Sequence, residues 1–316
     1  MWKNRRVLVT GATGLLGGHL VEKLLEEGSE VTAIVRDFVP HSRYNLLPLP
    51  VNEVYGDIEN FDYVSRTINE YQIQTVFHLA AQTQVRVANV NPLPTMRTNI
   101  MGTVNILEAA RINKVNHVIV ASIDKAYGAS KVLPYDEGVP LRGSNPYDVS
   151  KSCADLLAQS YRKTYGMDIG ITRCGNLFGP GDLNFDRLIP YTIRQLLEDE
   201  PVIIRSDGTM IRDYFYVKDA VHAYMCLAER VDHLHSSENY IYNFSYGQPM
   251  TVLQVVKFIA KLMGVEVLPR IQDQANNEIQ EQHLDSSLAW NELKWEPIWT
   301  MGSALQQTIQ WYKENL

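Results

Sequence analysis

The chain has 316 residues, 45% of them hydrophobic, which is enough to bury one large core or two fused cores without a disulfide or a metal. Its formal net charge of −7 argues against a nucleic-acid binder, because such domains usually carry a basic excess or stripe. The 3 cysteines form no CxxC pair, and the first residues lack an apolar stretch long enough for a signal peptide or a membrane span. We therefore expect a cytoplasmic globular protein that acts on small molecules.

The amino-terminal half of the chain alternates short β-branched segments with helical ones. In chain order these are RVLVT (6–10), GLLGGHLVEKLLEEG (14–28), EVTAIV (30–35), TVFHLAA (75–81), VNILEAARINK (104–114) and HVIVAS (117–122). Strands that alternate with helices at this spacing predict right-handed crossovers between parallel strands. The expected fold class is α/β, with a doubly wound parallel sheet.

The regular alternation of strands and helices becomes less clear after residue 176. IGITRCGNLFGPG (169–181) and YIYNFS (240–245) indicate further strands, and RDYFYVKDAVHAYMCLAE (212–229) indicates a strand followed by a helix. The remaining segments mix short strands, loops and helices, which predicts a smaller α+β lobe interleaved with the sheet. We assign residues 1–176 and 212–245 to the doubly wound domain, and residues 177–211 and 246–316 to the smaller lobe.

A glycine-rich turn follows the first expected strand and opens the first expected helix. VLVTGATGLLGGHL (7–20) places Gly11, Gly14 and Gly17 in a G-x-x-G-x-x-G pattern. Glycines let the backbone approach a pyrophosphate closely, and a helix amino terminus offers unpaired N–H groups to its charge. The pattern predicts a dinucleotide-binding turn, with a plain tight turn as the alternative.

Two positions bear on which dinucleotide binds. An NAD-binding domain places an acid at the end of the second strand, where this chain has Arg36, and an arginine there can pair with a 2′-phosphate. This favours NADP over NAD, with a solvated Arg36 beside Asp37 as the alternative. Asp57, at the end of the third strand, is placed to meet the adenine or to form an Asx turn.

A second group of candidate residues lies in NPYDVSK (145–151). Asn145 and Pro146 are typical of a helix start, so Tyr147 and Lys151 lie four residues apart on one helical face. A phenol beside an ammonium ion and a nicotinium charge is expected to have a lowered pKa, which suits a general base for an alcohol. Alone this pair is common on solvated helices, but Ser122 and the glycine turn strengthen the prediction.

Together these motifs identify a family. TGATGLLG (10–17), HLAA (78–81), TNIMGT (98–103), Ser122, Tyr147, Lys151, RCGNLFGPG (173–181) and RDYFYVKD (212–219) resemble the extended short-chain dehydrogenase/reductase family. Within it the chain is similar to the nucleotide-sugar epimerases and dehydratases. The resemblance implies a Rossmann-type NAD(P)-binding domain and a lobe that closes over a nucleotide sugar. It also implies a homodimer built from the helix after TNIMGT and the helix that bears Tyr147.

The resemblance also implies roles for individual residues. Ser122, Tyr147 and Lys151 would be catalytic, with Asn99 supporting the lysine through water. Implied cofactor contacts are Gly11, Thr13, Gly14, Leu15, Leu16, Arg36, Asp57, Ile58, Leu79, Ala80, Ala81, Asn99, Tyr147 and Lys151. Implied substrate contacts are Gln82, Arg86, Asn176, Arg187, Arg205 and Arg212, of which Asn176 and Arg212 would hold the diphosphate. A bidentate guanidinium suits a diphosphate, and a surface ion pair with Asp213 is the alternative for Arg212.

The stretch ASIDKAYG (121–128) carries the functional prediction. Aligned on the family's serine turn, Asp124 and Lys125 fall where C5 and C6 of the sugar would lie. Simple 4-epimerases tend to have small or apolar residues there, whereas 4,6-dehydratases have an acid followed by a second proton carrier. We therefore expect transient oxidation at C4, loss of water across C5 and C6, and return of the hydride to C6. A structural ion pair is the alternative for Asp124 and Lys125.

The motifs say less about which nucleotide sugar is the substrate. The dTDP-glucose enzymes resemble TDE at this turn, while DKA resembles UDP-N-acetylglucosamine and CDP-glucose 4,6-dehydratases. CDP-glucose enzymes resemble RPWQHV where this chain has RDYFYV, and the UDP-N-acetylglucosamine dehydratases with DKA lack the tyrosine that Tyr147 supplies. We favour a UDP-sugar narrowly, with a 4-epimerase as the second hypothesis and a non-catalytic cofactor sensor as the third. His233 and His235 have no neighbouring third ligand, so no metal is expected.

Overall fold

The computed structural model describes residues 1–48, 50–231, 239–274 and 279–316. Within these residues a seven-stranded sheet has the strand order β11-β6-β5-β4-β1-β2-β3, and all its neighbouring strands run parallel. Its strands are β1 (Arg6–Thr10), β2 (Glu30–Val35), β3 (Asn52–Tyr55), β4 (Thr75–His78), β5 (His117–Ile123), β6 (Ile169–Cys174) and β11 (Ile241–Phe244). The α/β fold class predicted from the sequence is confirmed.

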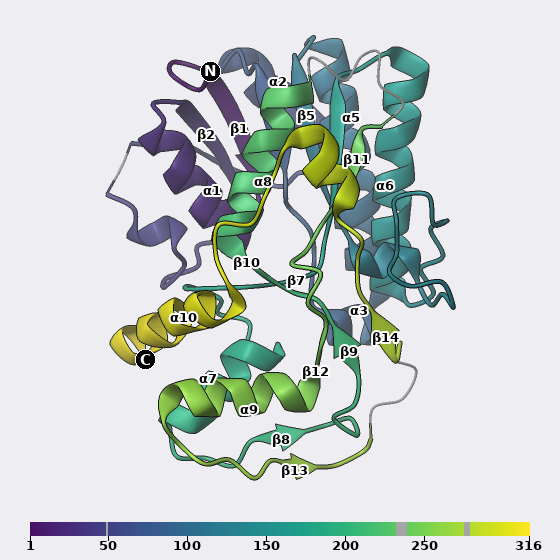
Figure 1. Cartoon of the computed structure of the whole chain (residues 1–316). Helices are drawn as coiled ribbons and strands as arrows, with labels where there is room; N and C mark the ends of the chain where they lie inside the picture. Colours follow the sequence, from purple (N-terminus) through teal and green to yellow (C-terminus); the bar gives the residue numbers. More distant parts are fainter. Residues whose placement is uncertain (49, 232–238, 275–278) are drawn as a thin grey trace.

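Helices cover both faces of this sheet (Figure 1). The main ones are α1 (Leu15–Glu26), α2 (Phe61–Glu70), α5 (Gly102–Ile112), α6 (Pro146–Tyr165) and α8 (Val217–Arg230). Shorter turns are η1 (Tyr44–Leu46), α3 (Val85–Val90), α4 (Pro92–Met96), η2 (Arg97–Met101) and η3 (Asp124–Tyr127). Because successive strand residues point to opposite faces, Val7 and Val9 of β1 enter the core with α1 and α8, whereas Leu8 enters the core with α2 and α5.

The smaller lobe lies below the sheet domain in Figure 1 and is built from short elements. They are α7 (Leu188–Leu197), β8 (Ile203–Ile204), β9 (Ile211–Arg212), β12 (Met250–Thr251), α9 (Val252–Met263), β13 (Arg270–Ile271), β14 (Glu281–Gln282) and α10 (Met301–Asn315). The short helix η5 (Ala289–Leu293) lies instead against α8 and β11 of the sheet domain (Figure 1). A separate parallel pair joins β7 (Asn176–Phe178) to β10 (Tyr214–Tyr216). The chain leaves the sheet after β6, builds part of the lobe, and returns through α8 to β11.

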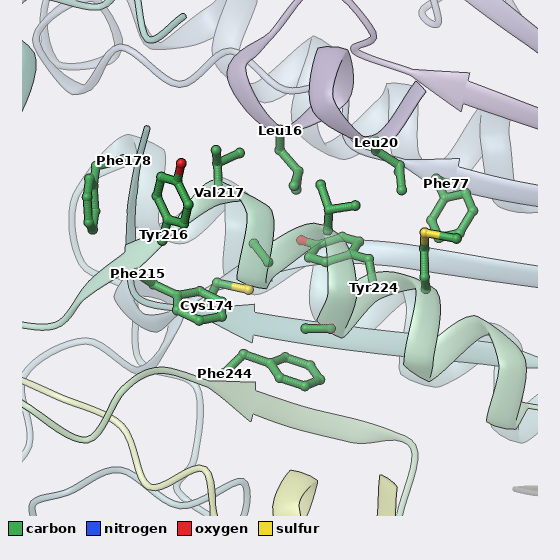
Figure 2. Close-up of a cluster of buried hydrophobic side chains, with 14 of the residues drawn as sticks. Leu16, Leu20, Phe77, Cys174, Phe178, Phe215, Tyr216, Val217, Tyr224 and Phe244 are labelled. Carbon is green, nitrogen blue, oxygen red and sulfur yellow. The ribbon is translucent and has the colours of Figure 1, made fainter. Parts of the chain in front are cut away.

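A large apolar cluster fastens the returning segments together. Figure 2 shows Leu16 and Leu20 of α1 gathered with Tyr224 of α8 and Phe244 of β11. Trp295, which is fully buried, meets Phe244 edge to face with ring centroids 5.0 Å apart. It meets Phe215 of β10 in the same way at 5.7 Å. The segment before α10 is therefore part of the core of the sheet domain.

A buried ion pair links β6 to α6. Arg173 Nε and Nη2 donate to the two carboxylate oxygens of Asp155 at 2.8 and 2.9 Å, and both side chains are buried. Arg173 Nη1 also donates to the Tyr127 hydroxyl at 2.9 Å, which ties the pair to the turn that begins at Asp124. Asp155 lies one helical turn after Lys151 on α6. The pair therefore fixes the position of the Lys151 helix relative to the turn η3.

Replacing Arg173 with Met is expected to destabilise the fold by about 3–5 kcal/mol, because it leaves the Asp155 carboxylate buried without its charge partner. Urea unfolding followed by circular dichroism measures this loss. Lys23→Met, which breaks an exposed pair with Glu27, is the matched control and should unfold at nearly the same urea concentration as the original protein. Equal unfolding of the two variants would contradict a structural role for the buried pair.

Candidate active site

The turn between β1 and α1 has the geometry of an anion cradle. Gly11 has a φ of +74°, and a Cβ there would lie 2.8 Å from the backbone nitrogen of Ala80. A Cβ on Gly17 would lie 2.1 Å from the carbonyl oxygen of Gly11. Helix α1 starts after Gly14, which offers no side-chain cap, so the first N–H groups of the helix are left for a ligand. These residues fit a dinucleotide pyrophosphate.

The remaining predicted cofactor contacts lie around this turn. Thr13 and Leu15 are partly buried and Leu16 is buried at the start of α1. The backbone N–H groups of Leu79 and Ala80 donate to Thr10 Oγ1 at 3.2 and 3.1 Å, which holds the segment through Ala81 beside β1. The carbonyl oxygen of Ile58 accepts a hydrogen bond from Asn105 at 2.9 Å, and the Ile58 side chain is buried.

Arg36 and Asp57, the two residues that bear on the adenosine end, each make a local contact. Arg36 is 56% exposed, and its Nε lies 2.6 Å from the carboxylate of Asp37, with which it forms an ion pair. Asp57 Oδ1 accepts a hydrogen bond from the backbone N–H of Glu59 at 2.9 Å, which is an Asx turn. Asp37 therefore competes with any phosphate for the Arg36 guanidinium.

Ser122, Tyr147 and Lys151 come together where β5 meets α6. Ser122 is buried at the carboxyl end of β5, and its hydroxyl has no hydrogen-bond partner among the described residues. Lys151 Nζ donates to the carbonyl oxygen of Ala121, directly before that serine. Asn99 donates to Ser150 Oγ at 2.9 Å and exchanges hydrogen bonds with the backbone of Gln82, so it supports the neighbourhood of Lys151.

Burial dominates the electrostatics of this group. It lowers the pKa of Lys151 to about 8, although Asp155 opposes the change. It raises the pKa of Tyr147, and the Arg187 guanidinium only partly opposes the rise. Among the protein's own side chains, the loss of water around Tyr147 outweighs the positive charge of Arg187. The lowered pKa expected from the sequence includes the charge of a bound nicotinamide, and it stays a prediction for the complex with the cofactor.

Asp124 and Lys125 begin the turn η3, directly after β5. Asp124 is fully buried, and neither carboxylate oxygen has a hydrogen-bond partner in the described part of the chain. Burial raises the pKa of Asp124 to about 7, and the Asp213 carboxyl adds to the rise while Lys125 and Arg212 oppose it. The charge of Lys125 is the largest influence that opposes this rise, so a structural ion pair between the two residues stays the alternative.

The predicted substrate contacts divide into two groups. Asn176 of β7 donates to the carbonyl oxygen of Asp213 at 3.3 Å, and Arg187 pairs with Asp182 at 3.1 Å on the side of Tyr147. Arg212 donates to the carbonyl oxygen of Ile211 at 2.8 Å and is close enough to Asp124 to influence its charge. These three therefore border the buried group.

The other predicted substrate contacts are more peripheral. Arg86 and Arg205 are 75% and 67% exposed and lie 4.0 and 3.9 Å from the carboxylate of Asp186. Asp186 thus faces one arginine of α3 and one that follows β8. The Gln82 side chain accepts a hydrogen bond from the backbone of Gln84, beside Asn99.

Sequence reasoning missed three buried polar residues at this site, Asp213, Tyr135 and Gln282. An acid directly after Arg212 in a strand was a visible signal for Asp213, and it was interpreted only as a surface partner. Gln282 lies in a two-residue strand that has no recognisable pattern.

A family model described as the NAD dependent epimerase/dehydratase family matches residues 7–243, which span the glycine turn, η3, α6 and β10. The chain belongs to this family. It is an enzyme of the NAD dependent epimerase/dehydratase family, and the resemblance stated from its motifs is confirmed.

Both dehydratases and epimerases are similar to this member of the family. CDP-glucose 4,6-dehydratase of Salmonella typhimurium is 32% identical over 332 residues, covering 99% of this chain and 91% of the relative. The dTDP-glucose 4,6-dehydratase of Streptomyces venezuelae, solved with NAD bound, has a TM-score of 0.86 at 25% identity and covers 98% and 97% of the two chains. UDP-glucose 4-epimerase of Thermotoga maritima, solved with UDP-glucose, also has a TM-score of 0.86, at 27% identity over 98% and 99%. These relatives are named for nucleotide sugars.

Two negative findings apply to the described residues alone. They contain no group of three or more His, Cys, Asp or Glu side chains that could hold a metal ion, and His233 and His235 lie outside them. None of their helices combines the length and the apolar character that crossing a bilayer requires.

Proposed function

We propose that this family member is a nucleotide-sugar 4,6-dehydratase that forms a 4-keto-6-deoxy sugar from a UDP- or CDP-hexose, with UDP-N-acetylglucosamine as the leading candidate. Asp124 is the observation that supports this most strongly. A fully buried carboxyl with a pKa of about 7 is protonated in a large fraction of molecules at neutral pH, as a general acid must be. A reaction confined to C4 has no use for such a group.

The roles of the remaining residues follow from the chemistry. Tyr147 takes the proton of the C4 hydroxyl, Ser122 donates a hydrogen bond to the same oxygen, and Lys151 supplies positive charge beside them. Oxidation at C4 makes the C5 hydrogen acidic, so the neutral amine of Lys125 removes it as a proton. Asp124 then protonates the departing C6 hydroxyl, and water leaves.

We assign the cofactor as NAD. When bound, it supplies the redox chemistry by accepting a hydride from C4 and returning it to C6. The glycine cradle fits its pyrophosphate, and the Streptomyces venezuelae relative was solved with NAD. The NADP expected from Arg36 is not supported, because Asp37 already holds that guanidinium.

If Asp37 competes for Arg36, the original protein should bind NAD more tightly than NADP. Asp37→Ala should then improve the affinity for NADP by about tenfold, because the freed guanidinium can pair with the 2′-phosphate. Isothermal titration with both cofactors measures this, and Asp62→Ala at the start of α2 is the control. A preference for NADP in the unaltered protein would restore the expectation from the sequence.

A panel of UDP-, CDP- and dTDP-hexoses tests the function itself. Incubation with NAD, followed by mass spectrometry and NMR, should show loss of one water and a 4-keto-6-deoxy product. Inversion at C4 without loss of water would favour a 4-epimerase, the activity for which the Thermotoga maritima relative is named. Absence of turnover with every sugar would favour a cofactor sensor.

The same proposal covers the roles of the two parts of the chain and the oligomeric state. We assign residues 1–176 and 212–245 to cofactor binding, and 177–211 and 246–316 to nucleotide-sugar binding. A homodimer through α5 and α6 is supported by apolar side chains that these helices and the preceding turn leave exposed. They include Met101, Ile112, Leu156 and Tyr165.

Light scattering should report a dimer, and Leu156→Glu should shift it toward the monomer, because a charge would enter an apolar contact. Leu268→Glu changes a more exposed leucine of the smaller lobe, 96% exposed against 53% for Leu156, and should leave the mass unchanged. A monomeric original protein would overturn this part of the proposal.

A further inference from the structure

Asn243 of β11 joins three segments that border the candidate site. Its side chain is fully buried. Its Oδ1 accepts a hydrogen bond from the Tyr127 hydroxyl at 2.7 Å, and its Nδ2 donates to the carbonyl oxygens of Tyr135 and Asp285 at 2.9 and 3.2 Å. The backbone N–H of Asn243 donates to Glu137 Oε1 at 2.7 Å. The turn η3, the loop after it and the segment after β14 therefore meet on one residue, to which the reaction described above gives no role.

Tyr127 is the last residue of η3, the turn that begins with Asp124. It is fully buried, and its ring packs against that of Tyr135 with centroids 5.0 Å apart. Its hydroxyl donates to Asn243 and accepts from Arg173 Nη1 at 2.9 Å, so the donor and an acceptor position are both used inside the protein. Because a turn of 4 residues connects them, a shift of Tyr127 moves Asp124 as well.

The turn has a second anchor on α6. The carbonyl oxygen of Ala126 accepts a hydrogen bond from Ser152 Oγ at 3.0 Å. Ser152 directly follows Lys151, so this anchor holds the middle of the turn to the helix that bears the tyrosine and lysine assigned to C4. The Tyr127 anchor reaches β11 instead, which carries none of the groups assigned to oxidation at C4. Without the Tyr127 anchor the end of the turn is free to shift while those groups keep their places.

The burial of Asp124 depends on how closely this turn lies against the sheet. Burial raises the pKa of Asp124 to about 7, whereas its ordinary value is 3.8. A turn that shifts outward would admit water to the carboxyl, and hydration favours the charged form. Proton transfer is also sensitive to position, since a displacement of about 1 Å can slow a reaction about 10²-fold. Both the charge and the placement of the acid are therefore tied to the Tyr127 anchor.

We propose that Tyr127 is a positioning residue for the elimination step: its hydrogen bond to Asn243 holds η3, and so the two proton carriers, against C5 and C6 of the hexose. The assignment rests on the 4,6-dehydratase reaction proposed above and adds the support that its acid and base require. Neither Tyr127 nor Asn243 contacts the substrate in this assignment. Their effect on the reaction passes through Asp124 and Lys125.

Tyr127→Phe removes this hydrogen bond and keeps the ring in place. Arg173 remains paired with Asp155, so no buried charge loses its partner. In a single turnover the variant should oxidise C4 at the original rate, eliminate water about 10–10²-fold more slowly and accumulate the 4-keto hexose. Stopped-flow absorbance of the nicotinamide and NMR of quenched reactions measure the two steps.

Tyr242→Phe is the matched control. Tyr242 is fully buried on the same strand, faces the opposite side from its neighbour Asn243, and donates to Glu292 Oε2 at 2.7 Å. Its variant also loses a tyrosine hydrogen bond but leaves η3 anchored, so oxidation and elimination should both keep their original rates. Equal slowing of both steps in Tyr127→Phe, or unchanged elimination, would overturn the proposal.

Titration of the Asp124 carboxyl tests the anchor without substrate. NMR of protein labelled with carbon-13 aspartate, with the Asp124 signal assigned by its absence in Asp124→Asn, should show a pKa of about 7 in the original protein. Tyr127→Phe should lower this pKa by about one unit, because water reaches the carboxyl, and Tyr242→Phe should not. An unchanged pKa in Tyr127→Phe would contradict the role of the anchor. Inversion at C4 without dehydration in the original protein would end the dehydratase proposal, and this titration would then decide alone whether Tyr127 places Asp124.

Discussion

Replacing Tyr147 with Phe should slow turnover by about 10²–10⁴-fold, the range typical for loss of a general base. The ring is buried in α6 and the substitution keeps it, so the fold and the cofactor affinity should remain. Because the lost hydroxyl takes the C4 proton, oxidation at C4 should stall before any later step. Stopped-flow absorbance of the nicotinamide in a single turnover measures this step.

Tyr165→Phe is the matched control, because Tyr165 lies on the same helix and is 54% exposed. It should oxidise substrate at the original rate. If Tyr147→Phe also shows the original rate of C4 oxidation, Tyr147 is not the base, and Lys151, with its pKa lowered to about 8, becomes the candidate.

Replacing Asp124 with Asn should leave C4 oxidation intact and slow water elimination by about 10²–10⁴-fold, because the amide cannot protonate the departing hydroxyl. The 4-keto hexose should accumulate, and NMR of quenched reactions detects it. In the original enzyme the elimination step should slow as the pH rises through about 7, because Asp124 loses its proton there. Full dehydration by Asp124→Asn would show that the carboxyl is not the acid.

The same variant should be more stable than the original protein at pH 8. Burial raises the pKa of Asp124 from 3.8 to about 7, so ionisation favours the unfolded chain as the pH rises between these values. Asp124→Asn removes this penalty, and we expect a gain of about 2 kcal/mol, since the buried amide still carries part of the burial cost. The gain should vanish near pH 3, where the carboxyl is protonated in both states. Urea unfolding at the two pH values measures it.

Lys125→Met separates the two proton carriers. If Lys125 removes the C5 proton, this variant should oxidise C4 normally and lose exchange of the C5 hydrogen with deuterated water. Lys131→Met, at an exposed position of the following loop, should keep the exchange. Unchanged exchange in Lys125→Met would leave Asp124 with both proton transfers.

The sheet domain was predictable because its signals are local. The runs 6–10 and 30–35 are β-branched and become β1 and β2 without change, and Asn145 with Pro146 marks the start of α6. For the smaller lobe, the sequence predicted only its α+β class and not its individual strands. Its strands are two residues long, and their pairing depends on contacts across more than 60 residues, as between β9 and β14.

The candidate site divides in the same way. Motif spacing predicted that Ser122, Tyr147 and Lys151 would meet, since a strand end and a helix face are local features. It could not predict that the folded chain buries Tyr147, and this burial raises the pKa of the phenol among the protein's own side chains. The bond between Arg36 and Asp37 was visible only as an alternative, because sequence does not say which of two partners a guanidinium takes.

The contacts of Trp295 limit how this enzyme can be divided or recombined. Phe215 and Phe244 belong to the part assigned to cofactor binding, yet the ring that covers both comes from a segment assigned to the sugar-binding part. A fragment that stops at residue 245 would expose both phenylalanines and is expected to aggregate. Chimeras that exchange the sugar-binding parts of two relatives to change substrate choice should therefore exchange β10, β11 and the Trp295 segment as one block, or keep all three from the same parent.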